Sequence, residues 1–238
     1  MSNMVTATYS GESAKQVFDP NNNSYPKPYI IATSGVSLIV IGSGTVNSSG
    51  GFTLTTALPT IPKGIVDVYI YAGVGLAAGL YPATFTSTTQ CQLVGFPATT
   101  AGVYAGGTTA VSLATIKIPG GTLGPNGKLR VDIMYTGTTN ANQKNINILY
   151  GGNSLLGSIF GAAYTAITAR LFAELFNKGS ESVNVNLSSV SYSQVSVPPT
   201  YVTIDTSQTQ NLTFNCSATV ATDSIMIEHY VVTVYPSV

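Results

Sequence analysis

The sequence predicts an all-β protein, and three observations carry that prediction. Short runs rich in Val, Ile, Thr and Tyr recur along the chain, and these are the residues that pleated strands favour. Clusters of Gly, Asn, Ser and Pro separate the runs and mark turns. Apolar and polar residues alternate in several of the runs, as they do in strands with one buried face. Together these features are typical of an all-β sandwich or barrel.

The first 28 residues stand apart from this pattern and are expected to form an extended N-terminal arm. Their charged residues are Glu12, Lys15, Asp19 and Lys27. The arm ends in the run DPNNNSYPKP, whose Pro residues exclude a continuous helix or a central strand. Such a segment becomes ordered only against another surface. The chain is therefore expected to divide into an arm at 1–28 and a β-sandwich at 29–238.

Strands are expected from Tyr29 onward, each bounded by turn residues. Before residue 95 they are Tyr29–Ala32, Val36–Ile41, Phe52–Thr55, Ile65–Tyr71, Gly79–Phe85 and Cys91–Val94. After residue 110 they are Val111–Ile118, Lys128–Tyr135, Asn145–Tyr150, Leu155–Phe160, Ala166–Phe176, Ser182–Val190, Tyr201–Ile204, Asn211–Cys216 and Ile225–Val234. The Gly/Thr stretch at 95–110 is either a loop within one fold or a junction between an N-terminal β-element and a C-terminal sandwich.

Alternation is clearest in two neighbouring strands. In Lys128–Tyr135, one face carries Leu129, Val131, Ile133 and Tyr135, and the other carries Lys128, Arg130, Asp132 and Met134. In Asn145–Tyr150, the apolar residues Ile146, Ile148 and Tyr150 alternate with Asn145, Asn147 and Leu149. The polar stretch TGTTNANQK joins the two strands, so we expect them to form a hairpin with this stretch as a long surface loop.

The segment TAITARLFAELFNKG is compatible with two structures. A helix would end at Gly179, a residue that often caps helix C-termini. A strand would place Leu171, Ala173 and Leu175 on one side, with Phe172, Glu174 and Phe176 on the other. We favour the strand, because the surrounding sequence is β throughout.

Composition narrows the classes of function. Hydrophobic residues make up 44% of the chain and charged residues only 8%, with nine basic and nine acidic side chains. A surface with so little charge and no net charge favours association with copies or partners. The scattered Lys and Arg argue against nucleic-acid binding, which needs a basic stripe. The N-terminal residues lack the apolar core of a signal peptide, and no apolar run is long enough to span a membrane, so synthesis in a cytoplasm is expected.

No motif predicts catalysis, a metal or a cofactor. The single histidine, His229, follows Glu228, and the pair is read as a surface His–Glu on an exposed strand rather than as two ligands. A nucleophilic triad would need His229, and no G-x-S-x-G elbow precedes it. The carboxylates that could pair for glycoside hydrolysis are Asp67, Asp132, Glu174, Glu181, Asp205 and Asp223, and their spacing singles out none of them. We therefore expect a non-enzymatic protein.

Cysteine and tyrosine leave two questions open. Cys91 and Cys216 each lie in a strand-like run and are expected to be free core thiols, although the sequence leaves a bridge between them open. Tyr25, Tyr29, Tyr81 and Tyr104 lie near expected loops. They either stack on a sugar or a partner, or cap the rim of the core, and we favour the second role.

Several segments resemble virion structural proteins of tailed bacteriophages. They are SGVSLIVIGSGTVNSSGGFTLTTALPTIP, GLYPATFTSTTQCQLVG, IPGGTLGPNGKLRVDIMYTGTTNANQKNINILYGG, TIDTSQTQNLTFNC and HYVVTVYP. In that group the GPNG run opens a strand, T-N-x-x-x-K turns, and a Gly-Gly hairpin follows. The resemblance implies a jelly-roll-like antiparallel β-sandwich from residue 34 onward, with no catalytic residues. The group usually has Asn-Asn in the turn where this chain has Thr139-Asn140.

The resemblance also implies a function. The chain is expected to be a structural protein of the virion, often trimeric in this group, assembled in the cytoplasm of the host bacterium. We favour a capsid decoration protein bound to the major capsid protein or other virion proteins. The alternative is a tail-fibre or glycan-binding receptor protein. A polysaccharide depolymerase is less favoured. The arm would attach the protein through Phe18, Tyr25, Pro26, Pro28 and Tyr29.

Overall fold

The computed structural model describes residues 6–9, 12–15, 28–95, 99–160, 168–187 and 200–237, and these residues form strands and turns only. Nineteen strands and no helix occur among them, which confirms the all-β prediction. Within the described ranges, accordingly, no helix is long and apolar enough to cross a membrane. The ambiguous segment before Gly179 forms a strand, as its surroundings indicated.

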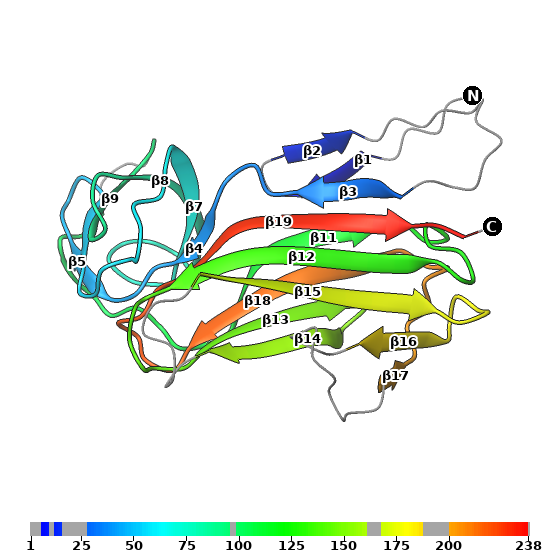
Figure 1. Ribbon diagram of the computed structural model, residues 1–238. Coiled ribbons are helices and arrows are strands. Elements are labelled where there is room, and N and C mark those ends of the chain that lie inside the picture. The colour runs from blue at the N-terminus through cyan, green and yellow to red at the C-terminus, as the bar shows by residue number, and fades with distance from the viewer. Residues whose placement is uncertain are drawn as a thin grey trace.

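The strands belong to a sandwich, a smaller unit and an N-terminal hairpin (Figure 1). The sandwich strands are β3 (Tyr29–Thr33), β11 (Val111–Ile118), β12 (Lys128–Gly137), β13 (Lys144–Tyr150), β14 (Asn153–Phe160), β15 (Thr168–Asn177), β16 (Asn184–Leu187), β17 (Thr200–Val202), β18 (Gln210–Ala218) and β19 (Ile225–Tyr235). The smaller unit contains β4 (Leu38–Val40), β5 (Gly44–Val46), β6 (Gly51–Leu54), β7 (Ile65–Ile70), β8 (Gly79–Phe85), β9 (Gln90–Leu93) and β10 (Gly102–Tyr104).

Two antiparallel sheets face each other in the sandwich. One sheet has the order β3-β19-β12-β15-β16-β17, and the other has the order β11-β18-β13-β14. Consecutive strands repeatedly change sheet, from β11 to β12, from β12 to β13, and from β18 to β19. A six-stranded and a four-stranded antiparallel sheet with such crossings form a jelly-roll-like antiparallel β-sandwich, the fold class that the sequence predicted.

The core of the sandwich is built by the alternating faces of both sheets. Leu129, Val131 and Ile133 of β12 are buried from one side, and Ile146 and Ile148 of β13 are buried from the other. Each of these side chains is at most 1% exposed, so the core between the two sheets is dry and closely packed. The division of β12, β13 and β15 into the two predicted faces is thus confirmed.

The predicted hairpin between β12 and β13 is wrong. β12 pairs with β15 and β19, whereas β13 pairs with β14 and β18 in the opposite sheet. The stretch between them therefore crosses from one sheet to the other. Alternation cannot distinguish the two arrangements, since strands that pair and strands that face each other across a core both bury every second residue. The Gly-Gly hairpin that follows does form, between β13 and β14, with positive φ at Gly151 and Gly152.

The smaller unit has its own hydrophobic core. Its sheet runs β10-β5-β6-β9-β8-β7-β4 and encloses Phe52, Val66, Val68 and Tyr104, all at most 1% exposed. The strands β5 and β10 were not predicted, because each has only three residues and lies in a Gly-rich stretch that reads as turn. Residues up to Tyr104 supply the core of the smaller unit and residues from Val111 onward supply the sandwich core, except for Ile31, Ala32, Leu38, Val40 and Met226, which belong to the other core in each case.

One strip of sheet belongs to both cores. β4 pairs with the beginning of β19 on one side and runs parallel to β7 on the other. Leu38 and Ile225 pack in the sandwich core, while Ile39 and Met226 pack in the core of the smaller unit. This explains why β4 and the first three residues of β19 are buried without alternation.

The loop between β18 and β19 joins the two units through close backbone contacts. The Ser43 amide donates to the Ala221 carbonyl at 2.7 Å, and the Gly42 amide donates to Ser224 Oγ at 2.8 Å. Glycine is required here, because a Cβ on Gly106 would lie 2.3 Å from the Ala221 oxygen, and φ at Gly106 is +68°. The smaller unit is therefore held directly against this loop.

A buried ion pair holds the same loop from the sandwich side. Lys144 Nζ lies 3.4 Å from Asp223 Oδ2, and the two side chains are 1% and 0% exposed. Asn140 bridges them, since it donates to Asp223 Oδ1 at 2.6 Å and accepts from Lys144 Nζ at 2.8 Å. The prediction that TGTTNANQK is a surface loop is therefore wrong in part: Thr136, Thr138 and Lys144 are buried, and only Thr139, Ala141 and Gln143 are exposed.

Cys91 and Cys216 are free thiols in different cores. Burial raises the pKa of both thiols to about 12, so the reactive thiolate is scarce at neutral pH. We expect a thiol reagent such as Ellman's reagent to modify neither cysteine in the native protein at pH 8, and both cysteines in urea. Rapid modification of the native protein, or a disulfide seen by mass spectrometry, would contradict this assignment.

The described part of the N-terminal arm is a short hairpin. β1 (Thr6–Tyr9) pairs antiparallel with β2 (Glu12–Lys15), and the hairpin lies beside β11 and β3 of the same chain (Figure 1). The remaining arm residues up to 27, among them Phe18, Tyr25 and Pro26, lie outside the described residues.

Candidate functional site

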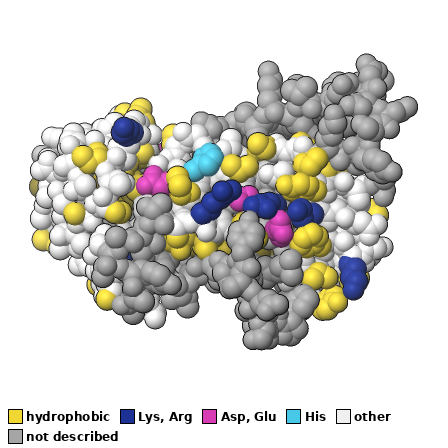
Figure 2. Space-filling view, in the orientation of Figure 1, with side chains coloured by type: hydrophobic (Ala, Val, Ile, Leu, Met, Phe, Trp, Pro, Cys, Tyr) yellow, Lys and Arg dark blue, Asp and Glu magenta, His cyan; other side chains and the backbone are white. Residues whose placement is uncertain are grey.

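The outward surface of the β3-β19-β12-β15-β16-β17 sheet is the most distinctive surface of the described chain, and we call it the outer face. It is formed by Ile30 and Thr33 of β3, Val231, Thr233 and Tyr235 of β19, Lys128, Arg130, Asp132 and Met134 of β12, Arg170, Phe172, Glu174 and Phe176 of β15, Val185 of β16 and Tyr201 of β17. Figure 2 shows basic and acidic side chains in a row across this face, with hydrophobic side chains on both sides.

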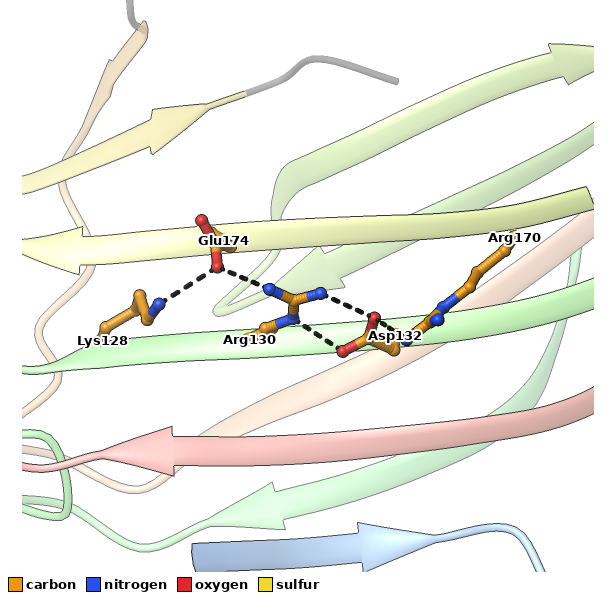
Figure 3. A network of polar contacts seen from close by, with 5 residues as sticks. All are labelled: Lys128, Arg130, Asp132, Arg170 and Glu174. Carbon is orange, nitrogen blue, oxygen red and sulfur yellow. Dashed lines mark hydrogen bonds and ion pairs between the residues drawn. The ribbon is translucent and has the colours of Figure 1, made fainter. Parts of the chain in front are cut away.

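Five charged side chains form the row, which we call the charged row (Figure 3). Glu174 Oε1 accepts from Lys128 Nζ at 3.1 Å and from Arg130 Nη1 at 3.4 Å. Arg130 also binds Asp132 with two hydrogen bonds, at 2.7 and 3.0 Å. Arg170 Nη2 completes the row at 3.0 Å from Asp132 Oδ1. The register between β12 and β15 brings these side chains together, because Arg130 lies opposite Glu174 and Met134 lies opposite Arg170.

Aromatic rings flank the charged row. Lys128 Nζ lies 4.1 Å from the ring centre of Tyr235 and 5.5 Å from that of Phe176, and the Arg130 guanidinium lies 5.0 Å from that of Phe172. A cation over an aromatic face is attracted by the negative charge density of the ring. The rings and the ion pairs therefore hold the same cations, which fixes long side chains that would otherwise sample many rotamers.

Asp132 has two cationic neighbours and is largely screened from water. Burial alone would raise its pKa, but the hydrogen bonds and charges of Arg130 and Arg170 outweigh burial and hold the pKa below its usual value. Asp132 therefore keeps its negative charge to a lower pH than an ordinary aspartate does.

Asp132→Asn tests this electrostatic arrangement through the pH dependence of stability. Because the pKa of Asp132 is lower in the folded than in the unfolded chain, its contribution is complete above the unfolded value and is lost as the pH falls through the folded value. We expect wild type to be more stable than Asp132→Asn at pH 6 and the difference to shrink as the pH falls below about 4. Urea unfolding of both proteins from pH 6 to pH 2 measures this, and a difference that stays constant with pH would contradict it.

Glu228 and His229 lie at a β-bulge next to the charged row. Met134 pairs with His229 and Tyr135 pairs with Ile227, so Glu228 is the extra residue in β19. Ser34 Oγ lies 3.1 Å from His229 Nδ1 and accepts from the Tyr230 amide at 3.0 Å, while Ser37 Oγ lies 3.3 Å from Glu228 Oε2. The strand is irregular here, and the two side chains fasten the β3–β4 connection to β19.

Four of the carboxylates singled out in the sequence lie in different surroundings. Asp132 and Glu174 are joined through Arg130, and Asp223 is buried against Lys144. Asp67 lies on β7 of the smaller unit, where burial raises its pKa. Among the residues that the structure describes, no group of three or more His, Cys, Asp or Glu side chains could hold a metal ion.

The tyrosines and prolines singled out in the sequence lie in different surroundings. Tyr104 is buried, and its hydroxyl accepts from the Tyr71 amide at 2.8 Å, so it belongs to the core and not to a binding loop. The Tyr81 hydroxyl donates to the Ala77 carbonyl at 2.6 Å. Tyr29 packs against the sandwich core at the start of β3, and Pro28 before it is exposed.

The sequence predicted only part of the outer face. It placed Lys128, Arg130 and Asp132 on one side of β12, and Phe172, Glu174 and Phe176 on one side of β15. It did not bring these two sets together, since nothing in either strand reveals that β12 pairs with β15. Arg170 and Tyr235 were not singled out. Alternation could have found both, because Arg170 lies four residues before Glu174 and Tyr235 lies two residues after Thr233, so each pair shares one face of its strand.

Comparison with known proteins adds little to the geometry. No protein-family model matches the chain, and no curated protein matches it. Solved structures with some likeness include dimeric latent PorU from Porphyromonas gingivalis, with 10% identity over 84% of this chain and a TM-score of 0.32. This chain spans 22% of that protein, and a score so low carries no argument. The class that fold and site define is therefore an all-β, jelly-roll-like sandwich with an ion-paired outer sheet face.

Proposed function

We propose that this chain is a non-enzymatic structural protein of a tailed-bacteriophage virion. One observation supports it best: the most elaborate group of side chains on the described surface is an ion-paired, aromatic-flanked sheet face. Such a face offers area for contact, and its charged groups are bound to one another. Ion pairs that neutralise each other can be covered by a protein surface at less cost than single charges.

Within this class, we propose a capsid decoration protein attached to the major capsid protein through the N-terminal arm. The low charge of the chain and its zero net charge support a role in a dense assembly, where a strongly charged surface would repel its neighbours. Attachment through an arm combined with contacts between neighbouring copies turns several weak contacts into a stable one.

Binding to virus heads tests this role. Full-length protein is mixed with heads purified from the phage that encodes it, and a chain beginning at Pro28 serves as the matched control. We expect the full chain to co-sediment with heads and the shortened chain, if folded by circular dichroism, to remain in the supernatant. Binding to host cells with no affinity for heads would reject decoration.

A receptor-binding protein of the tail fibre is the second candidate. Tyr201 favours it, because this ring is 62% exposed at the edge of the outer face and Lys178 Nζ lies 5.5 Å from its centre. Exposed aromatic rings beside polar groups stack on sugars. A glycan array probed with wild type and Tyr201→Ala distinguishes this candidate: it requires binding that the substitution abolishes. Release of reducing ends from host polysaccharide would instead indicate a depolymerase.

A further inference from the structure

We propose that the outer face is the docking surface for a second copy of this chain. The inference rests on the proposed function in one respect, namely that a virion structural protein works in many neighbouring copies. It goes further because it assigns the contact to one face and to one kind of partner.

The order of charges in the charged row favours a second copy as the partner. Along the row the signs alternate: Lys128 is positive, Glu174 negative, Arg130 positive, Asp132 negative and Arg170 positive (Figure 3). A second row laid antiparallel over the first and displaced by one charge leaves four of the five positions overlapping, each cation opposite an anion. A partner of a single sign would instead meet repulsion from either the cations or the anions. The row is thus complementary to itself.

The desolvation cost of docking is low for four of the five side chains of the charged row. Lys128, Arg130, Asp132 and Glu174 are only 13–25% exposed, and each already has an ionic partner within 3.4 Å. Most of their hydration has therefore been replaced within the folded chain, and docking removes little more. Only Arg170, at 73% exposure, has substantial water to lose.

Burial of the apolar side chains around the charged row would supply favourable free energy for docking. Ile30 is 52% exposed on β3, Met134 is 42% exposed on β12, and Tyr201 is 62% exposed on β17. They lie on three strands of one sheet, so a flat partner would cover all of them together. Aromatic and Arg side chains are enriched at protein interfaces, and Arg130, Phe172 and Tyr235 supply such groups on the same face.

The size of the outer face predicts a weak contact. Six strands about 4.8 Å apart, each contributing about seven residues at about 3.4 Å, present roughly 700 Å². A standard interface buries about 800 Å² on each partner, so this contact lies at the low end of stable interfaces. We expect reversible association that is evident at high protein concentration, such as the local concentration on an assembling particle.

Two isoleucines of equal exposure provide the test. Ile30 on the outer face and Ile65 on β7 of the smaller unit are both 52% exposed. Sedimentation velocity of the full chain over a wide concentration range gives the dissociation constant of the dimer for wild type, Ile30→Glu and Ile65→Glu. We expect Ile30→Glu to weaken dimerisation about tenfold or more, because an unpaired charge would be buried, and Ile65→Glu to leave it unchanged.

A charge exchange tests the row itself. One variant carries Asp132→Lys and Glu174→Lys, and the other carries Lys128→Glu, Arg130→Glu and Arg170→Glu. We expect each variant, once shown to be folded by circular dichroism, to stay monomeric alone and to form a dimer when the two are mixed. If these variants do not fold, the two isoleucine variants decide alone.

The outcomes separate this inference from the proposed function. A wild-type chain that stays monomeric at every concentration, or a dimer that Ile30→Glu leaves intact, overturns self-docking even if the protein still binds virus heads. If Ile30→Glu abolishes head binding while wild type never self-associates, the face binds another virion protein, and self-docking is again rejected. A dimer weakened by Ile30→Glu supports self-docking even where head binding fails.

Discussion

Replacing Lys144 by Met is expected to destabilise the protein by about 3–5 kcal/mol, the usual cost of removing one partner of a buried ion pair. Asp223 would remain buried without its cation, and its Oδ2 atom has no hydrogen bond in the described structure. The carbonyl of Asn142, which accepts from Lys144 Nζ at 3.0 Å, would lose that partner as well. Urea unfolding followed by circular dichroism at neutral pH measures the loss.

Two further variants control for charge and for coupling. Arg170→Met removes a cation from the exposed end of the charged row and should cost less than about 1 kcal/mol, as for other surface ion pairs. Lys144→Met combined with Asp223→Asn should cost less than the sum of the single changes, because the uncompensated charge is gone. If Lys144→Met costs no more than Arg170→Met, the buried pair does not hold the loop between β18 and β19.

Gly106→Ala is expected to have the second large effect, a loss of about 2–5 kcal/mol. The added Cβ would lie 2.3 Å from the Ala221 carbonyl oxygen and 2.8 Å from the Ser43 nitrogen, and both are backbone atoms that cannot rotate away. The positive φ adds strain to this overlap. Differential scanning calorimetry should show a lower melting temperature, and separation of the two cores should appear as a second transition.

Gly64→Ala measures the cost of a positive φ without the steric overlap that an added Cβ would cause at Gly106. Gly64 has a similar φ of +75°, but a Cβ there would have no atom within 4 Å. We expect a loss of only about 1–2 kcal/mol, the cost of a left-handed conformation for a residue with a side chain. Equal losses in the two variants would mean that the close approach to Ala221 contributes nothing to the joint between the units.

The strands themselves were largely predictable from sequence. Residue spacing predicted β8 and β11 with their observed bounds, because each is a long run of strand-forming residues between clear turns. The two faces of β12 and of β15 followed from alternation alone. Local pattern was sufficient wherever a strand has one buried and one exposed face. For β4 it predicted a strand, within the longer run Val36–Ile41, but not that all three of its residues are buried because two cores share the strand.

The pairing of the strands, and with it the outer face, could not be read from local pattern. The hairpin predicted between β12 and β13 was wrong because pairing depends on which sheet a strand joins. For the same reason, the ion pair of Arg130 with Glu174 required the register between two strands about 40 residues apart. Lys144 was placed on the surface because a polar turn gives no sign that a buried carboxylate 79 positions later (223 − 144) lies beside it.

The strip of sheet shared by the two cores has a consequence for how the protein is made. Met226 of β19 completes the core of the smaller unit, although the other buried residues of that core lie between Ile39 and Tyr104. β19 also lies between β3 and β12 and pairs with both, so the sandwich sheet is interrupted without it. A nascent chain still lacking Ile225–Tyr235 therefore has neither core complete when most of its residues have already left the ribosome. We therefore expect folding of the whole molecule to wait for this strand, and the apolar faces of both units to be exposed to aggregation until it arrives.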